Sequence, residues 1–185
     1  MNTANASKQI SFPSVKDGET FKIAGMEFIK FPEQNGCTPA VLKNIAFSSR
    51  FGDNNDLRDS EVLKRMQTEI LPKIIAEVGE ENLCTIKTDL TTLDGLKTYG
   101  EMESLISLPT LDFYRANVEI FDKHNPGKWW WLATPESAKP HDDPWWILCV
   151  SPSGCLINVF CNCIDLGVRP FLIFKSSIFE SCENG

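Results

Sequence analysis

The order of strand and helix patterns along these 185 residues predicts an α+β fold in which two helices pack on small antiparallel sheets. Three observations lead to this prediction. Residues 21–42 alternate apolar and polar side chains, two stretches with helical periodicity follow, and four short apolar runs separated by turns occupy residues 129–174. Because the helical stretches fall between two groups of strands, we expect both helices to lie on one side of the sheets.

The first strands are expected to form a hairpin. Residues 21–23 and 26–31 alternate on either side of Ala24-Gly25, a pair small enough for a tight turn. Residues 38–42 suggest a third strand. The Gly, Asn and Asp residues between positions 48 and 56 indicate a loop.

The first helix is expected to begin at Asp59 or Ser60, to kink or divide at Pro72 and to end at Gly79. Its apolar stripe is Val62, Leu63, Met66, Ile70 and Ile74. The second helix is expected to begin at Pro109 or Thr110. Its apolar face is Leu111, Tyr114, Val118 and Phe121. Residues 80–104 show turns at Asp94-Gly95 and Tyr99-Gly100 but no clear element.

Four short strands are expected after residue 128, at 129–134, 145–150, 155–160 and 168–174. Turns separate them, and residues 135–144 form a loop rich in proline and charge. This pattern predicts a meander or a small open sheet.

The chain is long enough for one domain, which we place at residues 16–180 between a flexible N-terminal arm (1–15) and a tail (181–185). About 70% of the unfolded surface of a chain this size can be buried, so the core needs no metal. No apolar run has the roughly 20 residues that would span a bilayer, and the N-terminus lacks the apolar core of a signal peptide. We therefore expect no membrane insertion, and synthesis in the cytoplasm.

The net charge is −7, and the C-terminal part is the more acidic one. Residues 1–100 carry 12 basic and 14 acidic side chains, against 6 basic and 11 acidic in residues 101–185. Because no basic stripe is present, direct nucleic-acid binding is not expected. An acidic surface suits a basic partner, although it also serves simply to keep a protein soluble.

Seven cysteines, an odd number, in a chain without a signal peptide predict reduced thiols. Cys161 and Cys163 lack the two-residue spacer of a zinc knuckle, so no metal and no cofactor is predicted. His141, Asp142 and Asp143 offer oxygen and nitrogen ligands for a cation, but a solvated acidic loop is the favoured interpretation. No serine motif or phosphate loop accompanies them, so no enzyme activity is predicted.

The tryptophans occur in two groups. In Trp129-Trp130-Trp131 neighbouring side chains point to opposite faces of a strand, so either one face carries exposed rings or both faces are covered. We favour the second alternative and predict a structural role for Trp130. Trp145 follows Pro144 and is predicted to be exposed, whereas Trp146 begins an apolar run and is predicted to join the core.

Arg169 lies within Gly167-Val-Arg-Pro170, inside an apolar strand. A guanidinium in such a place needs a carboxylate or several carbonyls to accept its five hydrogen bonds. We interpret Arg169 as a structural clamp.

Residues 129–135 (Trp-Trp-Trp-Leu-Ala-Thr-Pro) followed by Ser153-Gly154 and Gly167-Val-Arg-Pro-Phe-Leu resemble an uncharacterised domain family found in phages and in bacterial surface proteins. That family is similar to the C-type-lectin-like superfamily, which includes phage receptor-binding proteins and the variable proteins of retroelements. The resemblance extends upstream to residues 57–65 and 106–115, and it implies a C-type-lectin-like fold.

The resemblance implies a non-catalytic binding protein whose ligand contacts lie just before the Gly-x-Arg-Pro segment. In this chain the corresponding ligand-binding residues are His141, Asp142, Asp143, Trp145, Asn158, Phe160 and Asn162.

Two functions remain open. The first is a virion-associated adhesion module of a phage or prophage that recognises a host-surface glycan or protein, for which a homo-oligomer is expected because multivalency strengthens weak sites. The alternative is a phage-encoded inhibitor in the host cytoplasm that binds a host defence protein such as a nuclease.

Overall fold

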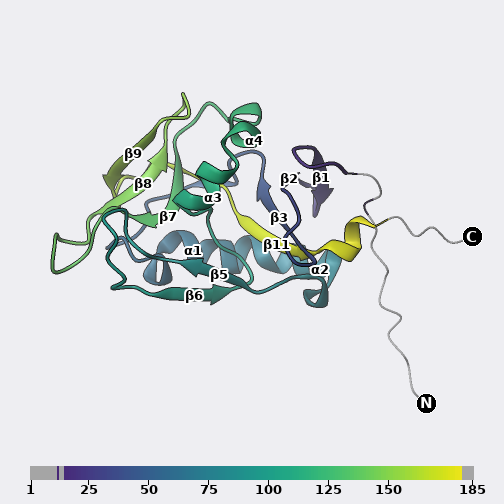
Figure 1. Ribbon diagram of the computed structural model, residues 1–185, viewed down its shortest axis with the longest axis horizontal. Coiled ribbons are helices and arrows are strands. Elements are labelled where there is room, and N and C mark those ends of the chain that lie inside the picture. The colour runs from purple at the N-terminus through teal and green to yellow at the C-terminus, as the bar shows by residue number, and fades with distance from the viewer. Residues whose placement is uncertain (1–11, 13–14, 181–185) are drawn as a thin grey trace, which may run out of the picture.

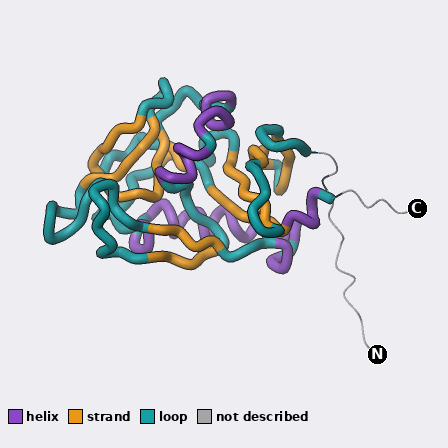
Figure 2. Tube along the Cα trace, in the orientation of Figure 1, coloured by secondary structure: helices purple, strands orange, loops and turns teal. Residues whose placement is uncertain are grey.

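The computed structural model describes Phe12 and residues 15–180. Most of the predicted N-terminal arm (residues 1–11 and 13–14) and the predicted tail (181–185) lie outside the described residues. The fold is α+β, as predicted: Figures 1 and 2 show two separate main sheets, with helices beside them and a smaller hairpin below. Phe12, from the predicted arm, packs against Phe21 and Phe179.

The strands form three sheets. The four-stranded sheet has the order β1 (Thr20–Ile23), β2 (Met26–Lys30), β3 (Cys37–Leu42), β11 (Phe171–Lys175). The five-stranded sheet has the order β4 (Phe47–Ser48), β10 (Gly167–Val168), β7 (Trp130–Pro135), β8 (Trp146–Val150), β9 (Leu156–Phe160). The third sheet is a hairpin of β5 (Ile86–Asp89) and β6 (Glu101–Ser104).

The predicted first hairpin and third strand are confirmed. Ala24 and Gly25 have φ values of 51° and 73°, so both turn residues are left-handed, which gives the connection the twist that a two-residue hairpin needs. The β5–β6 hairpin was missed, because its strands are short and polar and only their alternate side chains are buried.

The last predicted strand is divided, which corrects the expectation of one sheet after residue 128. β10 pairs parallel with β7, whereas β11 pairs antiparallel with β3 in the other sheet. Pro170 stands between them and has no N–H to continue a ladder, so the chain changes sheets there. Only β7, β8 and β9 form the expected meander.

The first helix begins and ends as predicted. The Ser60 side chain accepts a hydrogen bond from the Leu63 N–H at 3.0 Å, and Gly79 ends the helix with φ 80°. Between α1 (Glu61–Arg65) and α2 (Leu71–Val78) lies a π-helical turn, Met66–Ile70. Pro72, which lacks an N–H, follows this turn with only Leu71 between them, in agreement with the predicted division.

The second helix is broken at Asn117, which was not predicted. Thr110 caps α3 (Leu111–Ala116), and α4 (Val118–Lys123) begins after Asn117 departs from helical angles at φ −128°. The break disrupts the predicted apolar face. Leu111, Tyr114 and Phe121 are buried, but Val118 is 41% exposed.

A disulfide joins Cys37 of β3 to Cys84, with their Cα atoms 6.7 Å apart. The prediction of reduced thiols is therefore wrong for this pair, because sequence spacing does not reveal that the two residues meet across 47 positions. Cys149, Cys155, Cys161 and Cys163 are free. Burial raises the pKa of the Cys149 thiol to about 12, which leaves it protonated and unreactive at neutral pH.

Both faces of β7 are covered. Trp131 belongs to the larger apolar core with α1 and α2, and Trp130 belongs to a second core with Tyr114 and Phe121 of α3 and α4. The two predicted helices therefore pack against opposite faces of β7, which corrects the expectation that both lie on one side of the sheets. Only Trp129, just before the strand, is partly exposed, at 39%. Trp130 is thus fully buried, in keeping with its predicted structural role.

Arg169 is completely buried, but it has no carboxylate partner among the described residues. Its Nε donates to the Leu42 carbonyl at 2.9 Å, and its guanidinium carbon lies 4.8 Å from the centre of the Trp130 ring. Among the described residues, both terminal nitrogens lack a hydrogen-bond partner. One carbonyl and a ring face therefore take the place of the expected carboxylate or several carbonyls.

Candidate functional site

The base of the 135–144 loop is fixed by a buried asparagine from the distant 49–56 loop. Asn55 Nδ2 donates to the carbonyls of Ser137 at 2.9 Å and Trp146 at 2.7 Å, and its Oδ1 accepts from the Tyr99 hydroxyl at 2.7 Å. Because all three bonds are made inside the protein, both ends of the loop are held in place. On the outer side, Thr98 donates to the Lys139 carbonyl at 3.2 Å.

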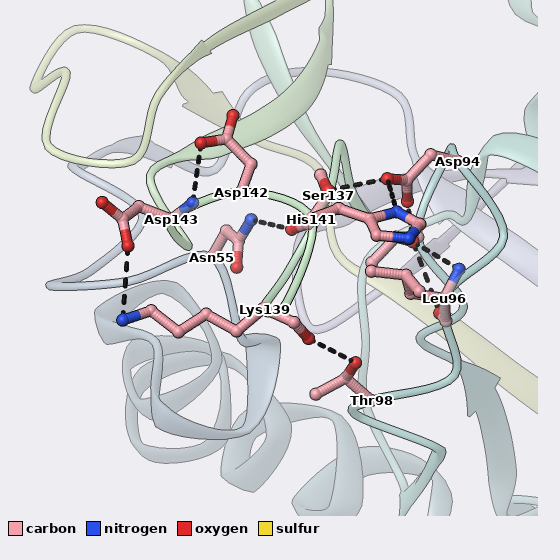
Figure 3. A network of polar contacts seen from close by, with 10 residues as sticks. Asn55, Asp94, Leu96, Thr98, Ser137, Lys139, His141, Asp142 and Asp143 are labelled. Carbon is pink, nitrogen blue, oxygen red and sulfur yellow. Dashed lines mark hydrogen bonds and ion pairs between the residues drawn. The ribbon is translucent and has the colours of Figure 1, made fainter.

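Asp94 anchors the outer part of the same loop (Figure 3). Its carboxylate accepts hydrogen bonds from the hydroxyls of Thr92 and Ser137, the latter at 2.7 Å, and lies 3.0 Å from His141 Nδ1. The Thr92 bond, followed by those of Ser137 and His141, holds the pKa of Asp94 well below its usual range. Ser137 donates to Asp94 and not to His141, so the three side chains brace the loop and do not form a nucleophile activated by a base.

Replacing Asp94 with asparagine is expected to loosen the loop without unfolding the domain. The amide side chain of the variant could accept at only one oxygen, and its NH₂ group would repel the hydrogen-bond donors that now face the carboxylate. Amide hydrogen exchange of residues 135–144 should become faster in the Asp94→Asn variant, while exchange in β8 should not change.

The same loosening is expected in the wild type on acidification. A carboxylate with a depressed folded-state pKa stabilises the fold fully above its unfolded pKa of about 3.9, and this contribution declines progressively as the pH falls from that value through the lower folded-state pKa. Exchange in the loop that does not respond either to the variant or to acid would contradict the anchoring role of Asp94.

Exposed apolar side chains gather around β9. Eight large apolar side chains are exposed among the described residues, and six of them lie in or near this strand: Leu93, Trp145, Leu156, Ile157, Phe160 and Ile164. Such a concentration is typical of an interaction surface and is unlike the single exposed apolar residues scattered over most proteins.

Trp146 departs from its prediction. It is half-buried, and its ring lies 3.9 Å from that of Phe160, centre to centre. The reason is that Trp146 pairs with Phe160 on β9, and no strand of the described residues lies beyond β9 to cover the two rings. Trp145, by contrast, is 47% exposed, as predicted.

Three adjoining hollows that share Leu93 form a groove beside β9. The central hollow, about 290 Å³, has the most apolar lining: Leu93, Leu111, Arg115, Glu136, Leu148, Leu156, Ile157 and Asn158. A hollow of about 370 Å³ continues it towards Ser137, His141 and Asp142, and one of about 240 Å³ continues it towards Asp89, Thr91 and Asp112. We call this continuous surface the Leu93 groove.

The structure divides the predicted ligand residues. His141, Asp142 and Asn158 line the Leu93 groove, and Asn158 donates a hydrogen bond to the Glu136 carboxylate. Phe160, 45% exposed, lies on the same strand as Asn158.

The remaining predicted residues do not line the groove; they are Asp143, Trp145, Phe160 and Asn162. Asp143 pairs with Lys139 at 3.4 Å, and Asn162 is exposed beyond the end of β9. Among the described residues, no three His, Cys, Asp or Glu side chains gather closely enough to hold a metal ion.

Several groove residues were missed from the sequence: Leu93, Arg115, Glu136, Leu156 and Ile157. Leu93 stands beside the Asp94-Gly95 turn, and a large apolar side chain in a region where small and polar residues predominate is the signal that could have identified it. Arg115 and Glu136 carry no such signal, because only the packing of α3 beside β7 brings them to the groove.

The fold and the groove define an α+β protein with a partly apolar surface groove beside an edge strand. In comparisons with known proteins, no family model, no curated protein and no solved structure matches the chain. Within the described residues, no helix has the length and apolar character required to cross a membrane.

Proposed function

We propose that this chain is a non-catalytic binding protein, and that it serves as an adhesion module of a phage or prophage which recognises a host-surface glycan or protein. The observation that carries the proposal is the gathering of six exposed large apolar side chains around β9 and the Leu93 groove. Exposed apolar surface costs solubility, so its concentration at one place favours a binding role.

A C-type-lectin-like fold is part of the same proposal. It is supported by the resemblance of residues 129–135 and 167–172 to that superfamily and by the pairing of the C-terminal β11 into the sheet that contains β1. The two short sheets, with helices beside them, agree with this assignment.

The groove and the exposed surface of β8 and β9 beside it offer the two kinds of contact that glycan and protein ligands require. The Trp146–Phe160 pair and Leu156 provide flat or apolar surface, while Asn158, Glu136 and His141 provide hydrogen-bonding groups that are already held in position. Single sites of this size are weak, so presentation in several copies on a virion would strengthen attachment.

The proposal predicts that Trp145→Ala and Phe160→Ala each weaken binding by about 2 kcal/mol or more, roughly thirtyfold, as expected for an exposed aromatic anchor. Trp145→Ala should change the free energy of unfolding by no more than about 0.5 kcal/mol, because this side chain is largely exposed. The measurement is binding of the multimerised protein to bacterial cells and to a glycan array, beside thermal melting of each variant.

Val118→Ala provides the matched control, since Val118 is also an exposed apolar residue but lies on α4, outside the groove. It should leave binding unchanged. If the multimerised wild type binds no cell-envelope component and no glycan, the adhesion proposal fails.

A second function is favoured by one observation. Asp142 and Asp143 are exposed next to Trp145, which places negative charge beside an aromatic side chain. Such a surface fits the basic groove of a nucleic-acid enzyme, as expected for a cytoplasmic inhibitor of a host nuclease. Inhibition of a purified nuclease, reversed by Asp142→Lys and by Asp143→Lys, would favour this alternative over adhesion.

A further inference from the structure

Within the described part of the chain, no strand pairs with the outer edge of β9, and no charge or proline protects it. β9 is the last strand of the five-stranded sheet, and Figure 1 shows it at the margin of the molecule. No residue from Cys155 to Ile164 is charged or is a proline. The other described edges differ. β1 carries Lys22, β4 has only two residues, and the outer side of β11 is bridged by Leu83 and Ser107. Both strands of the small hairpin carry charged side chains. Charged residues and short edges are the usual protection against pairing with another strand.

The hydrogen-bond pattern identifies which groups face outward. At one end of the β8–β9 ladder, the Cys161 N–H donates to the Trp145 carbonyl at 2.8 Å, and at the other end the Cys155 carbonyl accepts from the Ser151 N–H at 2.8 Å. Residues of an antiparallel strand bond alternately to the two sides. Odd-numbered residues therefore face β8, and the backbone groups of Leu156, Asn158 and Phe160 face the free edge.

We propose that β9 pairs antiparallel with β9 of a second copy of this chain, on a two-fold axis at Asn158. In this register Leu156 faces Phe160 of the other copy, and Asn158 faces Asn158. In this register each of the three residues whose backbone groups face outward lies opposite another such residue. If the axis is shifted by one residue, one of the three no longer has an outward-facing residue of β9 opposite it. The Phe160 carbonyl already accepts from the Cys163 N–H at 3.0 Å but keeps a second lone pair.

A second copy is the occupant that fits this strand best, because the strand is nearly symmetric about its centre. Leu-Ile-Asn-Val-Phe reads in either direction as large apolar, β-branched, asparagine, β-branched, large apolar. A two-fold contact joins identical surfaces, so each half of the strand must complement the other half. Two copies that each carry a net charge of −7 repel one another, and the uncharged run 155–164 is where they can meet without like charges facing each other.

The pairing has a consequence that rests on the proposed binding function. The two-fold axis of an antiparallel strand pair is perpendicular to the sheet, so both Leu93 grooves would open on the same side. Exposed Leu156 and Phe160 would contact each other across the junction, and one dimer would present two adjacent binding sites to a surface.

The test is the mass of the purified full chain by sedimentation equilibrium, with Asn158→Lys and Asn158→Ala as a matched pair. Both variants lose the amide group that donates to Glu136. Lysine can pair with that carboxylate in its own chain, but only lysine also places two like charges opposite each other on the axis. We expect a wild-type dimer, a dimerisation Kd raised at least roughly tenfold in Asn158→Lys, and a change below about threefold in Asn158→Ala. The Asn158→Glu variant alone should also dimerise more weakly than the wild type. Mixing it with the Asn158→Lys variant should restore dimerisation, as a dimer that contains one chain of each variant.

Several outcomes would overturn the proposal. A wild type that is monomeric up to submillimolar concentration would show that the edge is free or is covered by a different protein. A dimer that Asn158→Lys leaves intact would place the interface elsewhere, and a mixture of the two charged variants that stays monomeric would exclude the register. Because the readout is mass and not ligand binding, a dimer that binds no glycan or cell would refute the proposed adhesion function alone.

Discussion

Replacing Arg169 with alanine is expected to lower the free energy of unfolding by about 3–5 kcal/mol, a cost typical of removing a large, fully buried side chain. The guanidinium fills the space beside Trp130 and Phe121, and its Nε is the donor to the Leu42 carbonyl. Alanine would leave a cavity in the second core and a buried carbonyl without that donor. Urea denaturation of the two proteins measures the difference.

Arg169→Met separates the packing of this side chain from its charge. Burial lowers the pKa of Arg169 to about 10, which means that the protein interior disfavours the charged form. Methionine keeps most of the volume and removes that unfavourable charge, so we expect a loss below about 1.5 kcal/mol. An alanine variant within about 1 kcal/mol of the wild type would show that Arg169 does not support the core.

The second large effect is expected in the row of three tryptophans. Trp130→Ala and Trp131→Ala should each cost about 3–5 kcal/mol of stability. The reason is that Trp131 is buried in the larger core on one face of β7, and Trp130 is buried in the second core on the opposite face. Trp131 would also lose the hydrogen bond from its ring N–H to the Ser49 carbonyl, 2.9 Å long.

Trp129→Ala is the matched control for both variants. Its side chain is 39% exposed and precedes the strand, so its removal should cost about 1 kcal/mol or less. Thermal melting of the three single variants, measured in parallel, distinguishes the positions. Equal melting temperatures for all three would contradict the coverage of both faces of β7.

The structure also changes how the candidate site is understood. The resemblance directed attention to the 135–144 loop and to alternate residues of β9, and it predicted His141, Asp142 and Asn158, which do line the Leu93 groove. The loop is not a free acidic segment, however, because Asn55 and Asp94 tie it to two distant parts of the chain. Neither anchor lies near the loop in sequence, so no local pattern could have identified them.

Features that depend on neighbouring residues could be predicted from the sequence. Ser60 and Thr110 begin helices, Gly79 ends one, and Ala24-Gly25 turns a hairpin, because caps and turns are set by side chains within a few positions. Alternation in residues 129–134 likewise showed that tryptophans must point to both sides of a strand.

The packing of distant elements could not be predicted in this way, and the structure shows its consequences. It divided residues 167–175 between two sheets, joined Cys37 to Cys84, gave Arg169 a carbonyl and a ring in place of a carboxylate, and left β9 at an edge where Trp146 and Phe160 stay partly exposed. The physical reason is that periodicity shows which side chains share a face, whereas burial and exposure depend on what the rest of the chain places over that face.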